Sequence, residues 1–301
     1  ISVLSLLLGT AITVILSGNI VRPVNALSTA MQRVANGDYD VKLETKSNFE
    51  IIRRVYSDFN HMVDELNAVE TLRNDFVSNV SHEFKTPLSS IEGYAMLLQD
   101  ESLSAEARSE YTERIVVSTR RLSTLVSNIL MITKIENQTM PFTLSSYRVD
   151  EQVRQSILLL ENKWSEKNIG FEMDMDSIEF CAVEGLLGNV WSNLIDNAIK
   201  FSPEGEIIYI SLKEKDDMLS FKIANRGEPM SGETLKRIFE KFYQGDTSHK
   251  REGNGLGLAL VKKIVRVHGG SVSAVNTEDG LIEFTVNLPA KSSCERCCGS
   301  N

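Results

Sequence analysis

The chain has 301 residues, of which 42% are hydrophobic and 24% are charged. This composition is typical of folded domains, and the length leaves room for two or three of them. The net charge of −9 argues against a general affinity for the nucleic acid backbone, so we expect no nucleic acid among the partners.

Residues 1–21 contain no charged side chain. A bilayer crossing requires about 20 mostly apolar residues. Arg22 follows at once, and Arg33, Arg53 and Arg54 come later, which favours a cytoplasmic location for the downstream chain. A signal peptide is disfavoured because no basic segment precedes the apolar run, and a buried core helix is the other alternative. We expect a transmembrane helix in the lipid bilayer of the cell membrane, in a chain that is a piece of a longer protein.

Residues 22–70 contain two amphipathic helical patterns separated by a linker that starts at Asn36-Gly37, a typical helix end. The apolar positions of the first pattern are Val24, Leu27, Met31 and Val34, and those of the second are Ile52, Val55, Phe59, Met62 and Leu66. A single copy cannot cover these faces, so we expect a dimeric four-helix bundle. A plain coiled-coil spacer is the alternative.

Residues 76–88, FVSNVSHEFKTPL, are the most distinctive string of the sequence. Apolar residues recur here in steps of three and four, at Phe76, Val80, Phe84, Leu88, Ile91, Ala95 and Leu98, which predicts a helix. His82 lies about 200° around that helix from Val80, so the imidazole points to solvent together with Thr86, one turn further on. An exposed His flanked by the carboxylate of Glu83 can serve as a nucleophile, although a solvated surface His is the alternative.

We expect this helix to span residues 69–99 and to bend at Pro87, which lacks a backbone donor. After a polar stretch, Ser104 is the expected N-cap of a second helix that ends near Ile135. The apolar seam of this second helix has the seven-residue spacing of a coiled coil and consists of Ile115, Leu122, Leu125, Ile129 and Ile132. A hairpin of two helices is too thin to be stable alone, so we expect it to dimerise into a four-helix bundle.

Helices and strands alternate in residues 147–290, after a linker at 138–146. The expected helices are 150–167, 184–201 and one near Ile264, and the expected strands are 169–175, 207–212, 219–224, 271–276 and 281–288. This alternation predicts an α/β sandwich with helices on one face of a mixed sheet.

The four cysteines indicate no metal site. Cys181 stands in an apolar context and is expected to be a small buried residue. Cys294, Cys297 and Cys298 lie in residues 291–301, which we expect to be a disordered tail with free thiols. Their C-x-x-C spacing lacks the second pair of ligands that a zinc site requires.

Polar residues share one face of the helix expected at 184–201. Asn193, Asn197 and Lys200 are spaced i, i+4 and i+7, opposite an apolar face. Amide oxygens are suitable ligands for Mg²⁺, and a lysine offers a point charge to a phosphate. Taken alone, the pattern is that of any amphipathic helix.

A glycine-rich loop precedes the helix expected near Ile264. Gly253, Gly255 and Gly257 place backbone N–H groups where they could meet phosphates at a helix N-terminus. No strand leads directly into this loop, which disfavours a dinucleotide-binding fold. The preceding polar segment, 238–254, is a candidate lid, with Phe239 and Phe242 at its base and with Lys250 and Arg251 able to reach phosphates.

Taken in order, these elements resemble the domains of membrane-bound sensor histidine kinases. Residues 76–88 are similar to the phosphoacceptor box, 193–202 to the N box, Phe239 and Phe242 to the F box, and 251–265 to the G2 box, while Pro23, Glu50 and FNHM at 59–62 match a HAMP relay. The resemblance implies a multidomain chain: transmembrane helix 1–21, all-α HAMP relay 22–70, dimerisation and phosphotransfer hairpin 71–137, linker 138–146 and an α/β sandwich ATP-binding domain 147–290.

The resemblance also implies a reaction. A homodimer would bind ATP and Mg²⁺, the imidazole of His82 would take the γ-phosphoryl group with Glu83 as base or orienter, and an Asp of a cognate response regulator would receive it. Thr86 resembles the residue that positions a hydrolytic water for phosphatase activity. The implied nucleotide contacts are Asn193, Asn197, Lys200, Asn225, Gly227, Phe242, Lys250, Arg251, Gly253, Gly255, Leu256 and Gly257, and the implied metal ligands are Asn197 and Asn193.

The G1 box departs from the family pattern Asp-x-Gly-x-Gly. Asn225 replaces the Asp that binds adenine, Gly227 is kept, and Pro229 replaces the second Gly. A neutral amide can still bond adenine, but it lacks the assistance of a charge. One rival is therefore a degenerate kinase that acts as a phosphatase or scaffold. The others are an ATPase of chaperone or mismatch-repair type and a chemoreceptor-like protein without enzyme activity.

Overall fold

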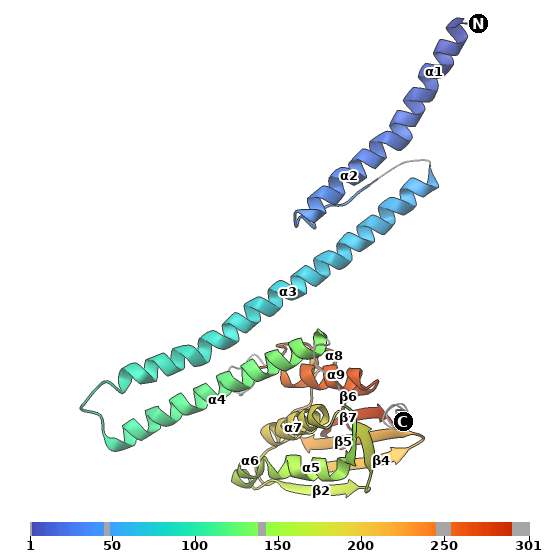
Figure 1. The fold of residues 1–301 in the computed structure, drawn as a ribbon. Coiled ribbons are helices and arrows are strands. Elements are labelled where there is room, and N and C mark those ends of the chain that lie inside the picture. Colours follow the sequence, from blue (N-terminus) through green and yellow to red (C-terminus); the bar gives the residue numbers. More distant parts are fainter. Residues whose placement is uncertain (1, 45–48, 138–142, 245–253, 291–301) are drawn as a thin grey trace. The chain divides into compact units, whose positions relative to one another are not determined.

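The computed structural model describes residues 2–44, 49–137, 143–244 and 254–290 (Figure 1). It divides into an N-terminal unit, residues 1–81, and a C-terminal unit, residues 82–301, with the boundary inside one long helix. The tail at 291–301, most of the expected linker and the lid residues Lys250, Arg251 and Gly253 lie outside the described residues.

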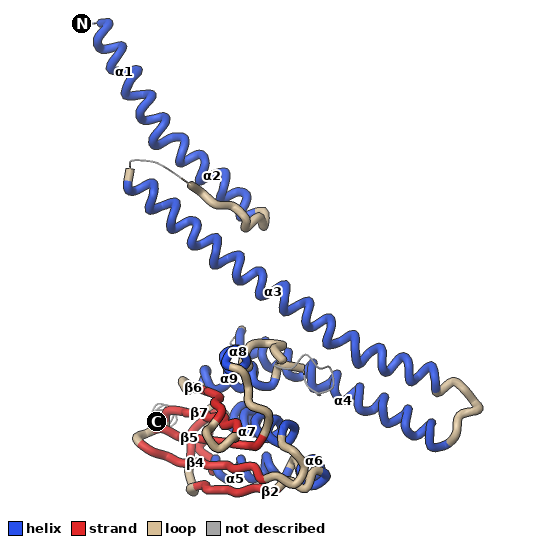
Figure 2. Tube along the Cα trace, turned by 180° about the vertical axis from the view of Figure 1, so that it is seen from behind, coloured by secondary structure: helices blue, strands red, loops and turns tan. Residues whose placement is uncertain are grey.

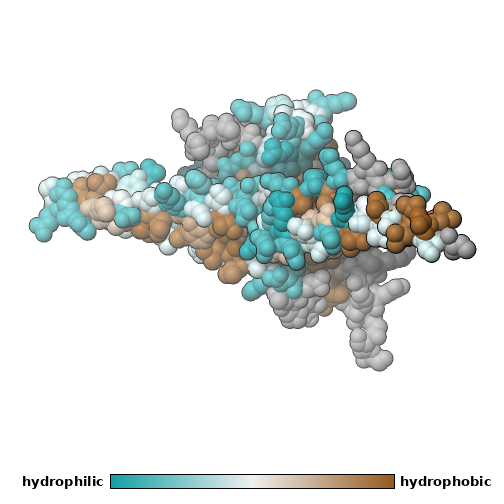
Figure 3. Space-filling model, turned by 90° about the horizontal axis from the view of Figure 1, so that it is seen from above, coloured by the Kyte–Doolittle hydropathy of each residue, from teal (hydrophilic) through white to brown (hydrophobic). Residues whose placement is uncertain are grey.

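The N-terminal unit begins with a helix that is apolar on all sides. Helix α1 (Ser2–Leu16) continues through a π-helical segment, η1 (Ser17–Val21), into α2 (Arg22–Ala35). The exposed fractions of Leu4, Leu6, Leu7 and Leu8 lie between 60 and 74%. Successive helical positions point about 100° apart, so apolar surface surrounds α1, and Figure 3 shows apolar side chains gathered at this end of the chain.

Helix α2, the connector after it and the first turns of α3 (Glu50–Leu97) share a small core of Ala30, Val41, Phe59 and Val63. The connector is held by the side chain of Asn60, whose amide accepts from the N–H of Leu43 at 2.9 Å and donates to its carbonyl at 2.8 Å. The Tyr56 hydroxyl donates to the carbonyl of Pro23 at 2.9 Å, which joins α3 to the start of α2.

The expected apolar stripe of the second HAMP helix is largely exposed in the single chain, as predicted for a face that one copy cannot cover. Tyr56 and Val63 are buried, whereas Val55, Met62 and Leu66 remain 39 to 45% exposed. Within the same chain, Val63 packs with Val41 of the connector and the Tyr56 hydroxyl bonds Pro23 of α2, whereas the second set faces outward. This outward face is the surface that a second copy would cover in a dimer.

Helix α3 is continuous through both helices that the sequence predicted, and it also continues through Pro87. It is followed by α4 (Ala105–Glu136), whose predicted N-cap is confirmed: the Ser104 hydroxyl accepts from the N–H of Ala107 at 3.2 Å. Within the C-terminal unit, Phe84, Ile91 and Leu98 of the predicted stripe are half-buried, and Phe84 packs against the core. Leu88 departs from the stripe, because it is 57% exposed while Pro87 beside it is buried. The predicted seam of α4 is confirmed, with every member buried or half-buried.

Of the described helices, α4 alone is long and apolar enough to cross a membrane by length and composition. Its residues Leu125, Ile132 and Ile135 are only 1 to 2% exposed and belong to the core of the C-terminal unit. Lys241 contacts Glu136 at the end of α4, with 2.9 Å between ammonium and carboxylate. We therefore assign α4 to the hairpin and not to a membrane.

The remaining residues of the C-terminal unit form a five-stranded mixed sheet in the order β2-β4-β5-β7-β6 (Figure 2). Its strands are β2 (Gly170–Met175), β4 (Ile207–Lys215), β5 (Met218–Arg226), β6 (Ser271–Asn276) and β7 (Leu281–Pro289). Only the β2–β4 pair is parallel. A separate antiparallel pair joins β1 (Ser145–Arg148) and β3 (Glu179–Ala182).

Helices cover one face of the sheet, as the alternation predicted. The helices of this part are α5 (Val149–Leu158), α6 (Glu161–Glu166), α7 (Glu184–Phe201), α8 (Gly232–Arg237) and α9 (Gly257–Val267), of which α7 and α9 contact the strands directly. On β4, Ile208, Ile210 and Leu212 point to the helices and are at most 2% exposed. The rings of Trp191 on α7 and Phe221 on β5 lie 4.7 Å apart between their centroids, which fixes α7 on the sheet.

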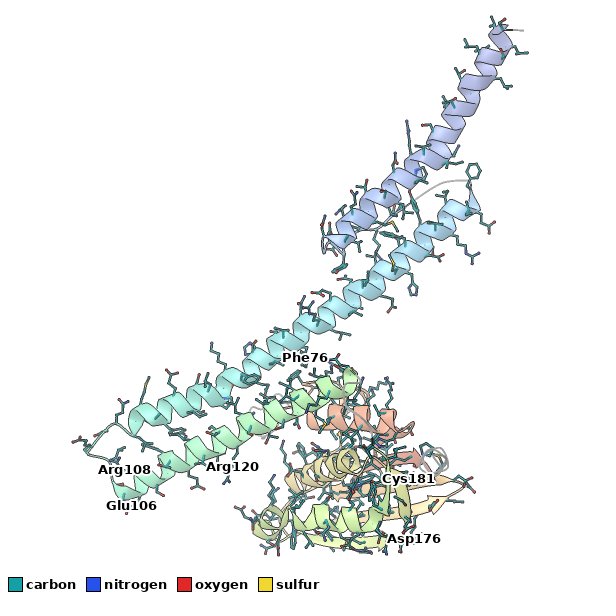
Figure 4. The ribbon with its side chains drawn as sticks, in the orientation of Figure 1. Phe76, Glu106, Arg108, Arg120, Asp176 and Cys181 are labelled. Carbon is teal, nitrogen blue, oxygen red and sulfur yellow. The ribbon has the colours of Figure 1, made fainter. Side chains whose placement is uncertain are left out.

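The differences from the predicted elements are local. The sequence pattern missed β1, β3 and α8, and the helix expected at 150–167 is interrupted between α5 and α6. Cys181, labelled in Figure 4, is buried in β3 as predicted, but it is disulfide-bonded. The expected free thiols are those of Cys294, Cys297 and Cys298, which lie outside the described residues.

Candidate active site

The phosphoacceptor candidate is exposed on α3. The His82 imidazole makes no hydrogen bond or ion pair with any residue that the structure describes. Thr86 lies one turn further along and is also exposed, and its hydroxyl donates to the carbonyl of His82 at 3.4 Å. Both side chains are therefore accessible to a partner or a substrate from solvent.

Glu83 points across the hairpin. Its carboxylate lies 3.7 Å from the guanidinium of Arg121 on α4, and the exposed fractions of the two side chains are 24% and 37%. The sequence predicts that Glu83 flanks the imidazole of His82, but it does not indicate the ion pair between Glu83 and Arg121. An ion pair this exposed contributes under about 1 kcal/mol, so the carboxylate can exchange its partner at low cost.

The N box has the predicted arrangement on α7. Asn193, Asn197 and Lys200 are half-buried on one face, while Trp191 and Leu194 on the opposite face are fully buried. The Asn193 amide donates to the carbonyl of Asn189 at 2.7 Å, which fixes the orientation of its side chain. The ammonium of Lys200 lies 4.6 Å from the centroid of the Phe201 ring.

The start of α9 lies against this polar face. A Cβ atom added at Gly257 would lie 2.6 Å from Oδ1 of Asn193, so only glycine permits this approach. The amide oxygen of the N box therefore lies beside the first turn of α9, where backbone N–H groups lack helical partners. Leu256, at the N-cap of α9, is fully buried and anchors this junction in the core.

The F box and the glycine-rich loop contact each other directly. The N–H of Phe242 donates to the carbonyl of Gly255 at 2.8 Å, and both residues have positive φ, at 63° each. A Cβ at Gly255 would lie 2.6 Å from the backbone of Phe242. A left-handed conformation costs a non-glycine residue roughly 1–3 kcal/mol and is concentrated at functional sites. Phe242 is therefore a strained position at the predicted base of the lid.

The altered G1 box forms the end of β5 and the loop after it. Asn225 is only 2% exposed, and its amide donates to the carbonyl of Arg226 at 3.0 Å. Gly227 packs closely, since a Cβ there would lie 3.1 Å from Ile282. Asn276 on β6 holds the far side of this loop through two bonds to the backbone of Met230, at 3.0 and 2.8 Å.

Sequence reasoning missed several residues that shape this site. Arg121 pairs with Glu83, Asn276 clamps the G1 loop, and Lys167 contacts the end of α7. Each acts across at least 30 residues of sequence, so no local periodicity could have revealed it. Among the described residues no group of three or more His, Cys, Asp or Glu side chains could hold a metal ion.

Three family models match the chain one after another. They are the HAMP domain over residues 15–68, the His Kinase A (phospho-acceptor) domain over 72–138, and the histidine kinase-, DNA gyrase B-, and HSP90-like ATPase over 182–292. The fold and the site thus define a nucleotide-binding domain joined to a phosphoacceptor hairpin. The chain belongs to the sensor histidine kinases, and its ATPase domain implies the binding of ATP.

Among known proteins, the chain is similar to the heme sensor protein HssS of Staphylococcus aureus (strain JH9). The identity is 33% over 291 residues, which are 96% of this chain and 63% of that protein. The chain therefore spans less than two thirds of the length of the curated relatives that it matches.

Solved structures show the same fold. Full-length ShkA in complex with AMPPNP is 28% identical with a TM-score of 0.54, over 71% of this chain and 45% of that one. The histidine kinase ThkA in complex with the response regulator protein TrrA has a TM-score of 0.60 at 23% identity, over 75% of this chain and 64% of that one.

Proposed function

We propose that the chain is the signalling part of a membrane-bound sensor histidine kinase, which transfers the γ-phosphoryl group of ATP to His82 and then to an Asp of a response regulator. The observation that carries this proposal is the exposed His82 imidazole on a helix that matches the phosphoacceptor domain, in one chain with the ATPase fold. Phosphatase activity toward the same regulator is part of the proposal.

ATP would lie between the polar face of α7 and the loop that leads into α9. Backbone N–H groups around Gly255 and Gly257 would bind phosphate oxygens, and Lys200 would add a positive charge. Asn225 and Gly227 would contact the adenine from the end of β5, and Phe242 and Leu256 would shape the lid and its junction with α9. By resemblance alone, Lys250, Arg251 and Gly253 would join the phosphate contacts.

The oxygen donors present fit a magnesium ion. Mg²⁺ prefers few protein ligands together with phosphate oxygens and water, and Oδ1 of Asn193 already lies beside the start of α9. Asn197 and Asn193 would hold the ion through their amide oxygens. When bound, Mg²⁺ neutralises charge on the β- and γ-phosphates.

In the phosphoryl transfer, a nitrogen of the His82 imidazole attacks the γ-phosphorus, so that an N–P bond forms while the bond to the ADP oxygen breaks. Glu83 would orient the ring or accept the proton of the other nitrogen. For this role Glu83 exchanges Arg121 for the imidazole, which the weakness of an exposed ion pair allows. Thr86, exposed one turn away, would position a hydrolytic water in the phosphatase reaction.

The partners follow from the exposed surfaces. The outer face of α4 leaves Val116, Val117, Val126 and Leu130 37 to 54% exposed, which suits pairing with a second copy in a homodimer. A response regulator would dock on the same hairpin beside His82, and the structure of ThkA with TrrA is that of a kinase of this fold with such a partner.

We also propose that residues 1–21 cross the cell membrane and that the chain after about residue 21 is cytoplasmic. The apolar surface around α1 and the HAMP domain that follows support this topology. Signals would reach the hairpin through rearrangement of the HAMP helices, which requires two arrangements of similar free energy.

Incubation of the full chain in detergent micelles with Mg²⁺ and γ-labelled ATP tests the kinase. We expect acid-labile label on the wild type, none on a His82→Gln variant, and undiminished label on His61→Gln, which removes another exposed His of α3. Absence of label from the wild type, even after Asn225→Asp, would favour the degenerate kinase. ATP turnover without label, unchanged by His82→Gln, would favour an ATPase of another type.

A further inference from the structure

Lys167 lies in the turn between α6 and β2 and reaches across to the end of the N-box helix. Its ammonium donates to the carbonyls of Ile199, Lys200 and Ser202, at 3.0, 2.9 and 3.1 Å. The backbone carbonyl of Lys167 also accepts from the N–H of Gly205 at 2.9 Å. One half-buried residue thus fixes both the last turn of α7 and the loop that leads to β4.

Chemistry explains why a lysine stands here. The last carbonyls of a helix lack intrahelical partners, and Pro203 prevents the helix from continuing. An ammonium offers three donors from a single point, and its charge is favourable at the negative end of the helix dipole. Hydrogen bonds from a charged donor are about twice as strong as neutral ones.

The turn that Lys167 fixes supports the proposed nucleotide site on two sides. It carries Lys200, the proposed phosphate contact, on the polar face of α7. The carbonyl of Phe201 lies 3.6 Å from the Cβ position of Gly227, which in turn lies 3.6 Å from the Asn225 amide. A shift of this turn would displace the phosphate contact and the adenine loop together.

We propose that Lys167 is a positioning residue for nucleotide binding, which acts through the backbone of α7 without touching ATP. This inference rests on the proposed function. It predicts that losing the ammonium weakens ATP binding and leaves the turnover of bound ATP nearly unchanged, because His82 and the N-box amides remain in place.

The test compares Lys167→Met with Lys163→Met in the full chain in detergent micelles. Lys163 pairs with the exposed side chain of Asp196 on the same helix, at 2.5 Å, so its ammonium bonds a side chain and not the end of the helix. We expect Lys167→Met to raise the Kd and KM for ATP about ten-fold, equivalent to ~1.4 kcal/mol, with kcat within about two-fold. Lys163→Met should keep wild-type values, and Lys167→Arg should recover most of the affinity.

All measurements are made well below the unfolding midpoint of each variant. A folded Lys167→Met chain with wild-type Kd and KM, even with a lowered midpoint, would overturn the inference, because the residue would then be structural only. If Lys167→Met does not fold, Lys167→Gln replaces it, and wild-type affinity in that variant has the same meaning. Failure of the wild type to bind ATP would overturn the proposed function together with this inference.

Discussion

Substitution of Gly257 by Ala should separate catalytic activity from stability. The added Cβ would lie 2.6 Å from Oδ1 of Asn193, whereas ordinary contact begins at 3.4 Å. The amide oxygen must therefore move by about 0.8 Å. The displaced atom is the far end of a side chain, so the fold can accommodate the methyl group at little cost, but the proposed metal ligand cannot stay in place.

The magnitude follows from the sensitivity of phosphoryl transfer to geometry. A misplacement of about 1 Å can lower a rate by roughly 100-fold, so we expect autophosphorylation by Gly257→Ala to fall between about 10- and 100-fold. The unfolding free energy should change by less than about 1 kcal/mol. The assays are the initial rate of labelling from γ-labelled ATP and a urea unfolding curve on the same sample.

Gly185→Ala is the matched control on the N-box helix itself. A Cβ at Gly185 meets no atom within 4 Å, so this variant should keep wild-type labelling and gain about 0.4–1 kcal/mol of stability. Wild-type labelling by Gly257→Ala would refute the assignment of Asn193 to the reacting centre. If Gly257→Ala lost labelling together with a large part of its unfolding free energy, the expected separation of catalytic activity from stability would be refuted.

Three further predictions concern the same domain. Gly255→Ala should lower stability by more than about 1 kcal/mol in urea unfolding, because φ is positive and the methyl group would meet the Phe242 backbone at 2.6 Å. Asp150→Asn should cost about 2–4 kcal/mol by the same measurement, since this carboxylate is 1% exposed and is bound by two arginines; an unchanged midpoint would contradict it. Burial holds the pKa of His268 in the folded chain below its usual value of 6.5. As the pH falls, the unfolded chain therefore binds a proton at a higher pH than the folded chain does, and stability should decline below about pH 6.5. The variant His268→Gln should lack this part of the decline in thermal scans.

The sequence predicted those parts of the structure that depend on local periodicity. The seam of α4 and the two faces of α7 follow from repeats of three to four residues, and the Ser104 cap follows from one residue type at a helix start. On the HAMP part of α3 the sequence pattern identified one of two apolar faces and missed the other. The missed face contains Tyr56, whose hydroxyl bonds Pro23 of α2, and Val63, which packs with Val41 of the connector, whereas most of the set that the pattern favoured is exposed.

The supporting contacts of the site could not be predicted, because they join distant segments through single side chains. Asn276 in the site, like Asn60 in the HAMP part, binds a loop through both the oxygen and the nitrogen of its amide, although asparagine in a sequence usually indicates only a turn or a cap. In the sequence, Lys167 looks like any solvated lysine, and only the structure shows that its ammonium donates to three carbonyls. Residue types reveal the groups that meet a ligand, whereas the groups that hold them emerge only from the fold.

The altered G1 box is best understood from the state without nucleotide. The Asn225 amide is buried and donates to the Arg226 carbonyl, a bond that a carboxylate could not make. An Asp at this position would be a buried charge facing a carbonyl oxygen until adenine arrived, and such a charge is costly. In the proposed site, Asn225 would weaken the bond to adenine and would also lower the free energy of the empty site. These two effects would change the affinity for ATP in opposite directions. The substitution by itself thus argues for a modest change in ATP binding and not for its loss.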